Sequence, residues 1–140
     1  MTFDGRRVLV VEDDFLVSLA TTDFLESIGC EVVGPASCLL AAVELAQSET
    51  LDAAVLDIDI SGETIWPVAT ELQHRGVPFV FLSALTPLMT FPALFAAAPR
   101  LDKPLEQNRL LRHFCSMWNF SADEAAHSAP HYSSPTRLLD

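Results

Sequence analysis

Short segments of this chain repeatedly end at residues that can hold a metal ion or a phosphoryl group. A short all-apolar run is typical of a strand that is buried on both faces of a parallel sheet. The carboxyl ends of such strands share one edge of the sheet, where ligands bind. We therefore expect carboxylates, a hydroxyl and an ammonium to converge on one site suited to a hard divalent cation and a phosphoryl group. The segments and the residues that follow them are 8–11 with Glu12 and Asp13, 53–56 with Asp57, 79–82 with Ser83, and 100–102 with Lys103.

The composition predicts one folded domain with an acidic surface. The chain has 140 residues, of which 50% are hydrophobic, and a formal net charge of -11. This length is enough to bury a core without disulfides or metal ions. A nucleic-acid-binding surface needs clustered lysine and arginine, so the charge argues against that class of protein and leaves protein partners open.

The cysteines and the hydropathy of the chain indicate a cytoplasmic protein. Cys30, Cys38 and Cys115 are odd in number and lack the CxxC spacing of a zinc site, which fits reduced thiols. No apolar run reaches the roughly 18 residues expected of a membrane span. Charged residues near the N-terminus stand where a signal peptide would have its long apolar core.

Strand and helix patterns alternate along the chain. This alternation predicts a doubly wound α/β fold, in which helices cover both faces of a five-stranded parallel sheet. We expect strands over residues 6–11, 30–33, 53–57 and 77–82, and a short strand ending at 102. We expect helices over residues 16–28, 37–47 and 63–75, and a last one through 111–118. Gly34-Pro35 should stop the second strand. The first helix should bury the apolar residues at helical spacing, which are Leu16, Leu19, Ala20, Phe24 and Ile28.

Two segments depart from this alternation. Residues 85–95 contain two prolines and no charge, and a proline inside a helix costs about 3 kcal/mol. We expect an interrupted helix over residues 84–99, part of which forms an exposed apolar patch. Binding of a phosphoryl group at the predicted site should expose or bury Leu88, Phe91 and Phe95 for a partner. Residues 119–140 have little to bury and are expected to form a tail without an output domain, which leaves 1–118 as the folded domain.

The chain from about residue 6 to residue 118 resembles the receiver domain of two-component response regulators. The motifs that carry the resemblance end strands in the right order, and they are Val11-Glu12-Asp13, Leu56-Asp57, Ser83-Ala84 and Lys103-Pro104. The resemblance implies a flavodoxin-like (βα)5 fold with strand order 2-1-3-4-5. It also implies a single-domain response regulator with Mg²⁺ as cofactor. Such a protein accepts a phosphoryl group on Asp57 from a histidine kinase or a phosphotransfer protein.

A finer resemblance covers residues 62–81. This stretch is similar to stand-alone alphaproteobacterial receivers whose fourth strand reads Pro-Phe-x-Phe-x-Thr-Gly. The chain departs from the family at Ser83-Ala84-Leu85, where the subgroup has Thr-Gly-aromatic, at Ser61, where most receivers have a proline, and at Arg100, where an aromatic residue is common. An arginine cannot fill an apolar slot without compensation for its charge. We therefore expect the switch signal to pass through the backbone of residues 84–99.

The acidic residues suit a Mg²⁺-dependent phosphoryl transfer. An aspartate can attack phosphorus, and Mg²⁺ is usually held by one or two carboxylates, waters and the phosphoryl oxygen. We expect Asp13 and Asp57 to bind the ion directly and Glu12 to act through water. By the resemblance, Asp59 contributes its backbone carbonyl. Asp14 is expected at a helix N-terminus, where a negative charge is favoured, rather than on the metal.

Ser83 and Lys103 complete the predicted site. Their hydroxyl and ammonium groups should bind the phosphoryl oxygens that the metal leaves free. The signal should then leave by protein–protein contact through residues 84–118, and a homodimer is one arrangement open to this face.

Two other functions compete with the phosphorylation switch. Asp57-Ile58-Asp59 also fits the DxDx motif of haloacid dehalogenase-type phosphatases, in which the first aspartate attacks and the second is the general acid. That motif normally opens the first strand, whereas two predicted strands precede it here. The altered Ser83-Ala84-Leu85 and Arg100 would instead suit a degenerate receiver that acts as an unphosphorylated docking module.

Overall fold

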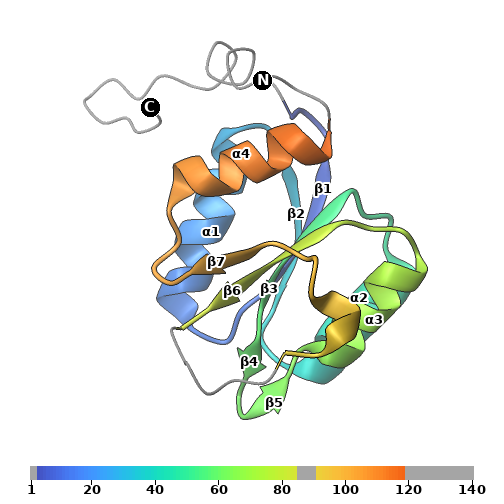
Figure 1. Ribbon diagram of the computed structural model, residues 1–140. Coiled ribbons are helices and arrows are strands. Elements are labelled where there is room, and N and C mark those ends of the chain that lie inside the picture. Colours follow the sequence, from blue (N-terminus) through green and yellow to red (C-terminus); the bar gives the residue numbers. More distant parts are fainter. Residues whose placement is uncertain (1–2, 85–90, 119–140) are drawn as a thin grey trace.

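The computed structural model describes residues 3–84 and 91–118, which form a doubly wound α/β domain (Figure 1). The central parallel sheet has five strands in the order β2-β1-β3-β6-β7. Its strands are β1 (Arg7–Val11), β2 (Glu31–Ala36), β3 (Ala53–Asp57), β6 (Phe79–Ser83) and β7 (Arg100–Asp102). This order is the predicted 2-1-3-4-5 arrangement, because the two remaining strands pair only with each other. The predicted flavodoxin-like fold is confirmed.

Helices cover both faces of the sheet (Figure 1). On one face lie α1 (Phe15–Ser27) and α4 (Gln107–Met117), which share a buried apolar cluster with the strands through Phe24, Leu25, Leu110 and Phe114. On the other face lie α2 (Leu39–Ser48) and α3 (Trp66–His74), whose buried residues include Ala42, Ala46, Val68 and Leu72. A short 3-10 helix, η1 (Ala93–Phe95), precedes β7.

The strand register brings the functional residues to one edge of the sheet. Every residue of β3 is buried, as expected for a central strand between two helical layers. At the carboxyl ends, Val11 pairs with Leu56, and Ser83 pairs with Asp102. The residues that follow β1 and β7 therefore lie beside the end of β3, where Asp57 is located.

The second strand runs further than the sequence predicts. It continues through Gly34 and Pro35 to Ala36, so the prediction that this pair stops the strand is wrong. Gly34 has a φ of +99°, and a Cβ there would lie 2.8 Å from the Ala36 nitrogen. Only glycine tolerates this bulged backbone, which lets the strand resume its pairing with β1 at Ala36.

The third helix is shorter than predicted, because a hairpin takes up its expected start. Strands β4 (Asp59–Ile60) and β5 (Glu63–Thr64) form an antiparallel pair after β3. The helix begins only at Trp66, with Pro67 in its first turn, where a missing N–H does no harm. In Figure 1 the hairpin lies below the carboxyl edge of the sheet.

The first helix buries a different set of residues from the predicted one. Phe24 and Ile28 are in the core, but Leu16 is 73% and Leu19 is 46% exposed, and Ala20 is exposed as well. Small polar residues, Ser18 and Thr21, are buried in their place. The apolar row that starts at Leu16 is exposed, whereas the buried row starts with Ser18 and Thr21, so periodicity favours the wrong side at the start of this helix.

The remaining predictions concern the end of the chain. In α4, Phe114 and Cys115 are buried as expected, with Leu110 beside them, while Leu111 and Trp118 are half-buried. Leu88 and residues 119–140 lie outside the described residues, so the predicted domain boundary at 118 stays a prediction. All three cysteines are free, and burial raises the pKa of the Cys30 thiol to about 12. Among the described residues, no helix is long and apolar enough to cross a membrane.

Candidate phosphoryl-transfer and metal site

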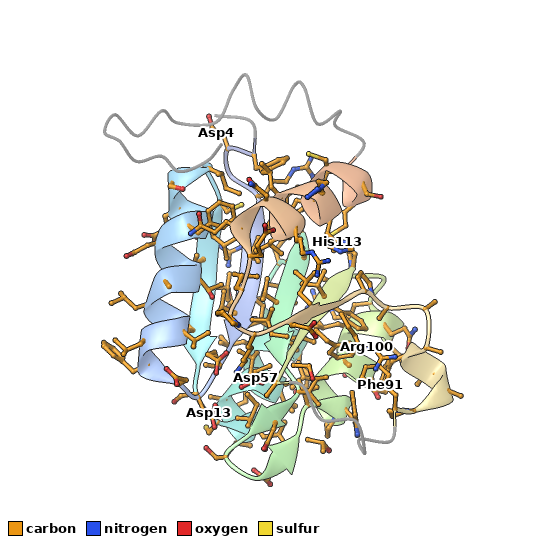
Figure 2. The ribbon with its side chains drawn as sticks, turned by 60° about the vertical axis from the view of Figure 1, so that its left-hand side comes forward. Asp4, Asp13, Asp57, Phe91, Arg100 and His113 are labelled. Carbon is orange, nitrogen blue, oxygen red and sulfur yellow. The ribbon has the colours of Figure 1, made fainter. Side chains whose placement is uncertain are left out.

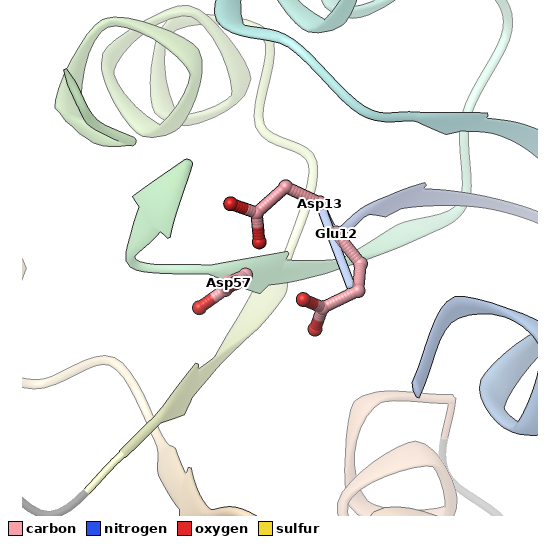
Figure 3. Close-up of side chains that lie close together, drawn as sticks. All are labelled: Glu12, Asp13 and Asp57. Carbon is pink, nitrogen blue, oxygen red and sulfur yellow. The ribbon is translucent and has the colours of Figure 1, made fainter. Parts of the chain in front are cut away.

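Three carboxylates converge at the ends of β1 and β3 (Figure 3). One carboxylate oxygen from each of Glu12, Asp13 and Asp57 lies within 4.8 Å of the others. Glu12 and Asp57 are only 3% and 4% exposed, whereas Asp13 faces solvent. The structure thus brings together the three side chains that the sequence predicts as metal ligands. Their roles as ligands stay a prediction.

Lys103 joins this cluster from the end of β7. Its Nζ lies 2.9 Å from Asp57 Oδ2 and donates a hydrogen bond to Glu12 Oε2 over 3.1 Å. Its backbone N–H donates to the Ser83 carbonyl, which fixes the lysine next to the end of β6. Burial alone would lower the pKa of Lys103, but the carboxylates of Asp57 and Glu12 raise it above its ordinary value. The ammonium is therefore charged at any physiological pH.

Asp57 is the buried centre of the site. Its burial, together with the nearby Glu12 carboxylate, raises the pKa of Asp57 from 3.8 to about 7, against the opposing effect of Lys103. Burying two carboxylates beside one ammonium leaves an excess of negative charge in a place of low dielectric. Binding of a further cation at this site is therefore favourable, because it offsets the excess negative charge.

The donor set fits a hard divalent cation such as Mg²⁺. Glu12 Oε1 is buried and accepts no hydrogen bond, although it lies 3.1 Å from Lys103 Nζ. This oxygen has an ion-pair contact but no hydrogen bond among the described residues, and a metal ion or a metal-bound water would give it a further partner. Carboxylate oxygens are also the ligands that Mg²⁺ prefers in proteins.

Ser61 holds Asp13, a contact that the sequence analysis missed. The Ser61 N–H donates to Asp13 Oδ2 over 2.8 Å. Partial burial would raise the pKa of Asp13, but this backbone hydrogen bond and its other hydrogen bonds lower it below its ordinary value. The pair Ser61-Gly62 is a sequence signal for a turn. A turn at this position brings the hairpin back to the end of β1, where the Ser61 N–H can reach Asp13.

The other predicted site residues lie at the rim of the cluster. Asp59 is exposed, and its Oδ1 accepts a hydrogen bond from the Gly62 N–H. Asp14 caps α1 by accepting from the Val17 N–H, as expected of a charge at a helix N-terminus.

The Ser83 hydroxyl donates to the Ala84 carbonyl over 2.9 Å rather than to a carboxylate of the site. The predicted roles of the Asp59 carbonyl and of Ser83 stay predictions.

Arg100 lies against Phe91 instead of filling an apolar slot. Its guanidinium carbon is 3.7 Å from the centre of the Phe91 ring, and both residues are labelled in Figure 2. This cation–π contact gives the exposed guanidinium a favourable partner. Phe91 in turn packs against Trp66 and Phe81, with ring centres 5.2 Å and 5.3 Å away. Phe95 is buried in the same group, and a change in its exposure on phosphorylation stays a prediction.

The fold is that of the receiver domains of two-component response regulators. The sequence profile of the response regulator receiver domain matches residues 8–114, and the chain belongs to this family. The finer resemblance to receivers with a Pro-Phe-x-Phe-x-Thr-Gly strand stays a prediction.

Known relatives support this assignment. The transcriptional regulatory protein PdtaR of Mycobacterium tuberculosis is 32% identical over 82 residues, which cover 58% of this chain and 40% of PdtaR. The solution structure of SdrG from Sphingomonas melonis is 29% identical, with a TM-score of 0.71 over 81% of this chain and 97% of SdrG. The receiver domain of the sensor kinase PA1611 from Pseudomonas aeruginosa, which holds a magnesium ion in its active site cleft, is 24% identical. It has a TM-score of 0.70 over 82% of this chain and 98% of that domain, which shows the fold alone.

Proposed function

We propose that this chain is a phosphorylation switch that accepts a phosphoryl group on Asp57. The observation that carries the proposal is the ion pair between Lys103 Nζ and Asp57 Oδ2, 2.9 Å long, beside the carboxylates of Glu12 and Asp13. The donor is the phosphohistidine of a histidine kinase or of a phosphotransfer protein. We also place the reaction in the cytoplasm, which the three free thiols favour.

The reaction is a direct displacement at phosphorus. An oxygen of the Asp57 carboxylate forms the new bond to phosphorus, while the bond from phosphorus to the imidazole nitrogen of the donor breaks. The nitrogen leaves with its electron pair. Lys103 then exchanges its contact with Asp57 Oδ2 for the phosphoryl oxygens, and the Ser83 hydroxyl turns from the Ala84 carbonyl to bind another.

Mg²⁺ would be held by Asp13 and Asp57 directly, by Glu12 through water and by the Asp59 carbonyl. When bound, the ion neutralises phosphoryl oxygens that would otherwise repel the carboxylates. The buried Glu12 oxygen without a donor supports this assignment, as does the magnesium in the cleft of the P. aeruginosa receiver.

The phosphodonor docks across the start of α1. Phe15, Leu16 and Leu19 are 75%, 73% and 46% exposed on this helix, directly after Asp13 and Asp14. A hollow of about 500 Å³ beside them is lined by Glu12 and Pro35 among others. Exposed apolar residues at the mouth of an acidic site suit contact with a partner that must bring its phosphohistidine to Asp57.

The competing functions find less support. A phosphatase of the haloacid dehalogenase type needs Asp59 as a general acid, but its side chain accepts from the Gly62 N–H and lies outside the carboxylate cluster. A degenerate docking module would not need the Lys103 contacts with Glu12 and Asp57. Downstream signalling then occurs by protein contact on the face formed by residues 84–118.

Incubation with acetyl phosphate followed by intact-mass analysis tests the proposal. With Mg²⁺ the protein should gain the mass of one phosphoryl group, and with EDTA in place of Mg²⁺ it should gain none. No gain in the presence of Mg²⁺ would overturn the switch. An equal gain in EDTA would overturn the metal dependence.

A further inference from the structure

A basic cleft lies between the edge strand β7 and helix α4, away from the carboxylate site. Its volume is about 600 Å³, and the residues that line it are Arg100, Leu101, Arg109, Arg112, His113 and Ser116. The chain as a whole has 8 basic and 19 acidic residues. Three of the eight basic residues thus line one cleft, and no acidic residue of the described ranges 3–84 and 91–118 contributes to it.

The helical wall of the cleft is one stripe of α4. Arg109, Arg112, His113 and Ser116 stand at positions i, i+3, i+4 and i+7, so they share one side of the helix. Leu110 and Phe114 occupy the opposite, buried side. Arg109 and Arg112 are exposed, and within the described part of the chain neither forms an ion pair with a carboxylate. The stripe offers two unpaired guanidinium groups to a ligand.

The other wall is the edge of the sheet. β7 pairs only with β6 among the described strands, and Figure 2 shows Arg100 on β7 and His113 on α4 at this edge. Arg100 points to Phe91, which keeps its guanidinium at the rim of the cleft. Asp102 and Glu106 do not line the cleft, and the Glu106 carboxylate accepts a hydrogen bond from the Arg109 backbone N–H at the start of α4.

We infer that this cleft binds an acidic segment of a downstream protein. The inference rests on the proposed function only in naming that protein as the receiver of the signal. An arginine side chain binds a carboxylate through two parallel hydrogen bonds, and the stripe from Arg109 to Ser116 spans about 10 Å of helix. This length matches two or three carboxylates on one and a half turns of a partner helix. It also matches carboxylates on alternate residues of an extended segment.

Charge distinguishes an acidic peptide from nucleic acid as the ligand. A net charge of -11 repels an extended polyanion whose phosphates continue beyond the cleft. A short acidic segment places its carboxylates against the arginines and can keep the rest of its surface neutral. The same net charge disfavours a second copy of this chain as the ligand of the cleft, because two acidic surfaces would have to come together.

Fluorescence anisotropy at low salt tests the inference, with a labelled dodecapeptide that carries three glutamates within one turn and a half of helix in an otherwise neutral sequence. Arg109→Gln and Arg112→Gln should each weaken binding by at least about threefold, which corresponds to one exposed charge-assisted contact. Arg75→Gln removes an equal charge at the end of α3 from a residue that does not line the cleft, and it should leave binding unchanged. Circular dichroism should confirm that all variants are folded.

Four outcomes would overturn the inference. These are no binding of the peptide, an equal loss in Arg75→Gln, tighter binding of a dodecathymidine strand through Arg109 and Arg112, or self-association that the two cleft variants abolish. Asp57→Asn should bind the peptide as wild type does in the unphosphorylated state. Loss of phosphorylation and loss of peptide binding are therefore separate readouts, so that either proposal can fail alone.

Discussion

The Ser61 N–H donates a hydrogen bond to Asp13 Oδ2 and so ties the β4–β5 hairpin to the end of β1. Ser61 has a φ of +53°, a left-handed conformation that is uncommon for any residue except glycine. Proline has no N–H, and its ring fixes φ near about -65°. The departure from the proline found in most receivers at this position thus has a physical reason in this chain.

Ser61→Pro should disrupt the hairpin and release Asp13. We expect unfolding free energy to fall by more than about 1 kcal/mol and Mg²⁺ affinity to fall with it. Ser61→Gly keeps the N–H and tolerates the left-handed backbone, so it should retain Mg²⁺ affinity. Thermal unfolding and calorimetric Mg²⁺ titration measure both. Equal Mg²⁺ binding by the proline and glycine variants would show that the Ser61 contact does not position Asp13.

Asp13→Asn should weaken Mg²⁺ binding by at least about tenfold, because a neutral amide replaces a direct carboxylate ligand. Asp14→Asn should bind Mg²⁺ nearly as wild type does, since asparagine caps a helix as well as aspartate and Asp14 is engaged with the Val17 N–H. Isothermal titration of wild type, Asp13→Asn and Asp14→Asn with Mg²⁺ measures the three affinities and shows which of the two aspartates binds the ion. A larger loss in Asp14→Asn would place the metal ligand one residue later than proposed.

Without divalent cations, folding stability should fall as pH rises from about 4 to about 7. The pKa of Asp57 is near 3.8 in the unfolded chain and about 7 in the folded one. Between these values the unfolded chain binds fewer protons than the folded chain, so rising pH favours unfolding, by up to about 1.4 kcal/mol per pH unit. The pKa of Asp13 lies below this window and that of Lys103 above it.

Asp57→Asn isolates this effect, because asparagine does not titrate. In EDTA it should be more stable than wild type at pH 8 and nearly equal to it at pH 4, as measured by urea unfolding. Asp59→Asn, which removes an exposed carboxylate nearby, should keep the pH dependence of wild type. If wild type and Asp57→Asn differ by the same amount at both pH values, the raised pKa of Asp57 is wrong.

Phosphorylation should change hydrogen exchange in Ala84 and in residues 91–99. The Ser83 hydroxyl must leave the Ala84 carbonyl to bind the phosphoryl group, and Phe91 is held from the other side by Arg100. Beryllofluoride with Mg²⁺ mimics the phosphorylated state, and Asp57→Asn is the control that should not respond. Changes confined to α1 and α2 would exclude this segment as the route of the signal.

The sheet and most of the site could be predicted because strong local signals coincide there. The apolar strands are buried on both faces, and their carboxyl ends meet at one edge, so Glu12, Asp13, Asp57 and Lys103 converge whatever the details of the loops. No such rule covers α1, where Ser18 and Thr21 are buried while Leu16 is exposed. The exposed apolar residues at the start of that helix reverse the pattern on which periodicity depends.

Backbone conformation accounts for the other differences. The bulge at Gly34 and the left-handed Ser61 depend on tertiary hydrogen bonds and close approaches that the sequence does not display. The contact between Arg100 and Phe91 joins residues on either side of η1, and Phe91 itself packs against Trp66 and Phe81. Arg100 could be identified as a departure from the family, but its partner could not.

The central claim is that Asp57 accepts the phosphoryl group, and intact-mass analysis of two aspartate variants tests it most directly. With acetyl phosphate and Mg²⁺, wild type and Asp59→Asn should each gain one phosphoryl group, and Asp57→Asn should gain none. A phosphoryl group on Asp57→Asn equal to that on wild type would contradict the account.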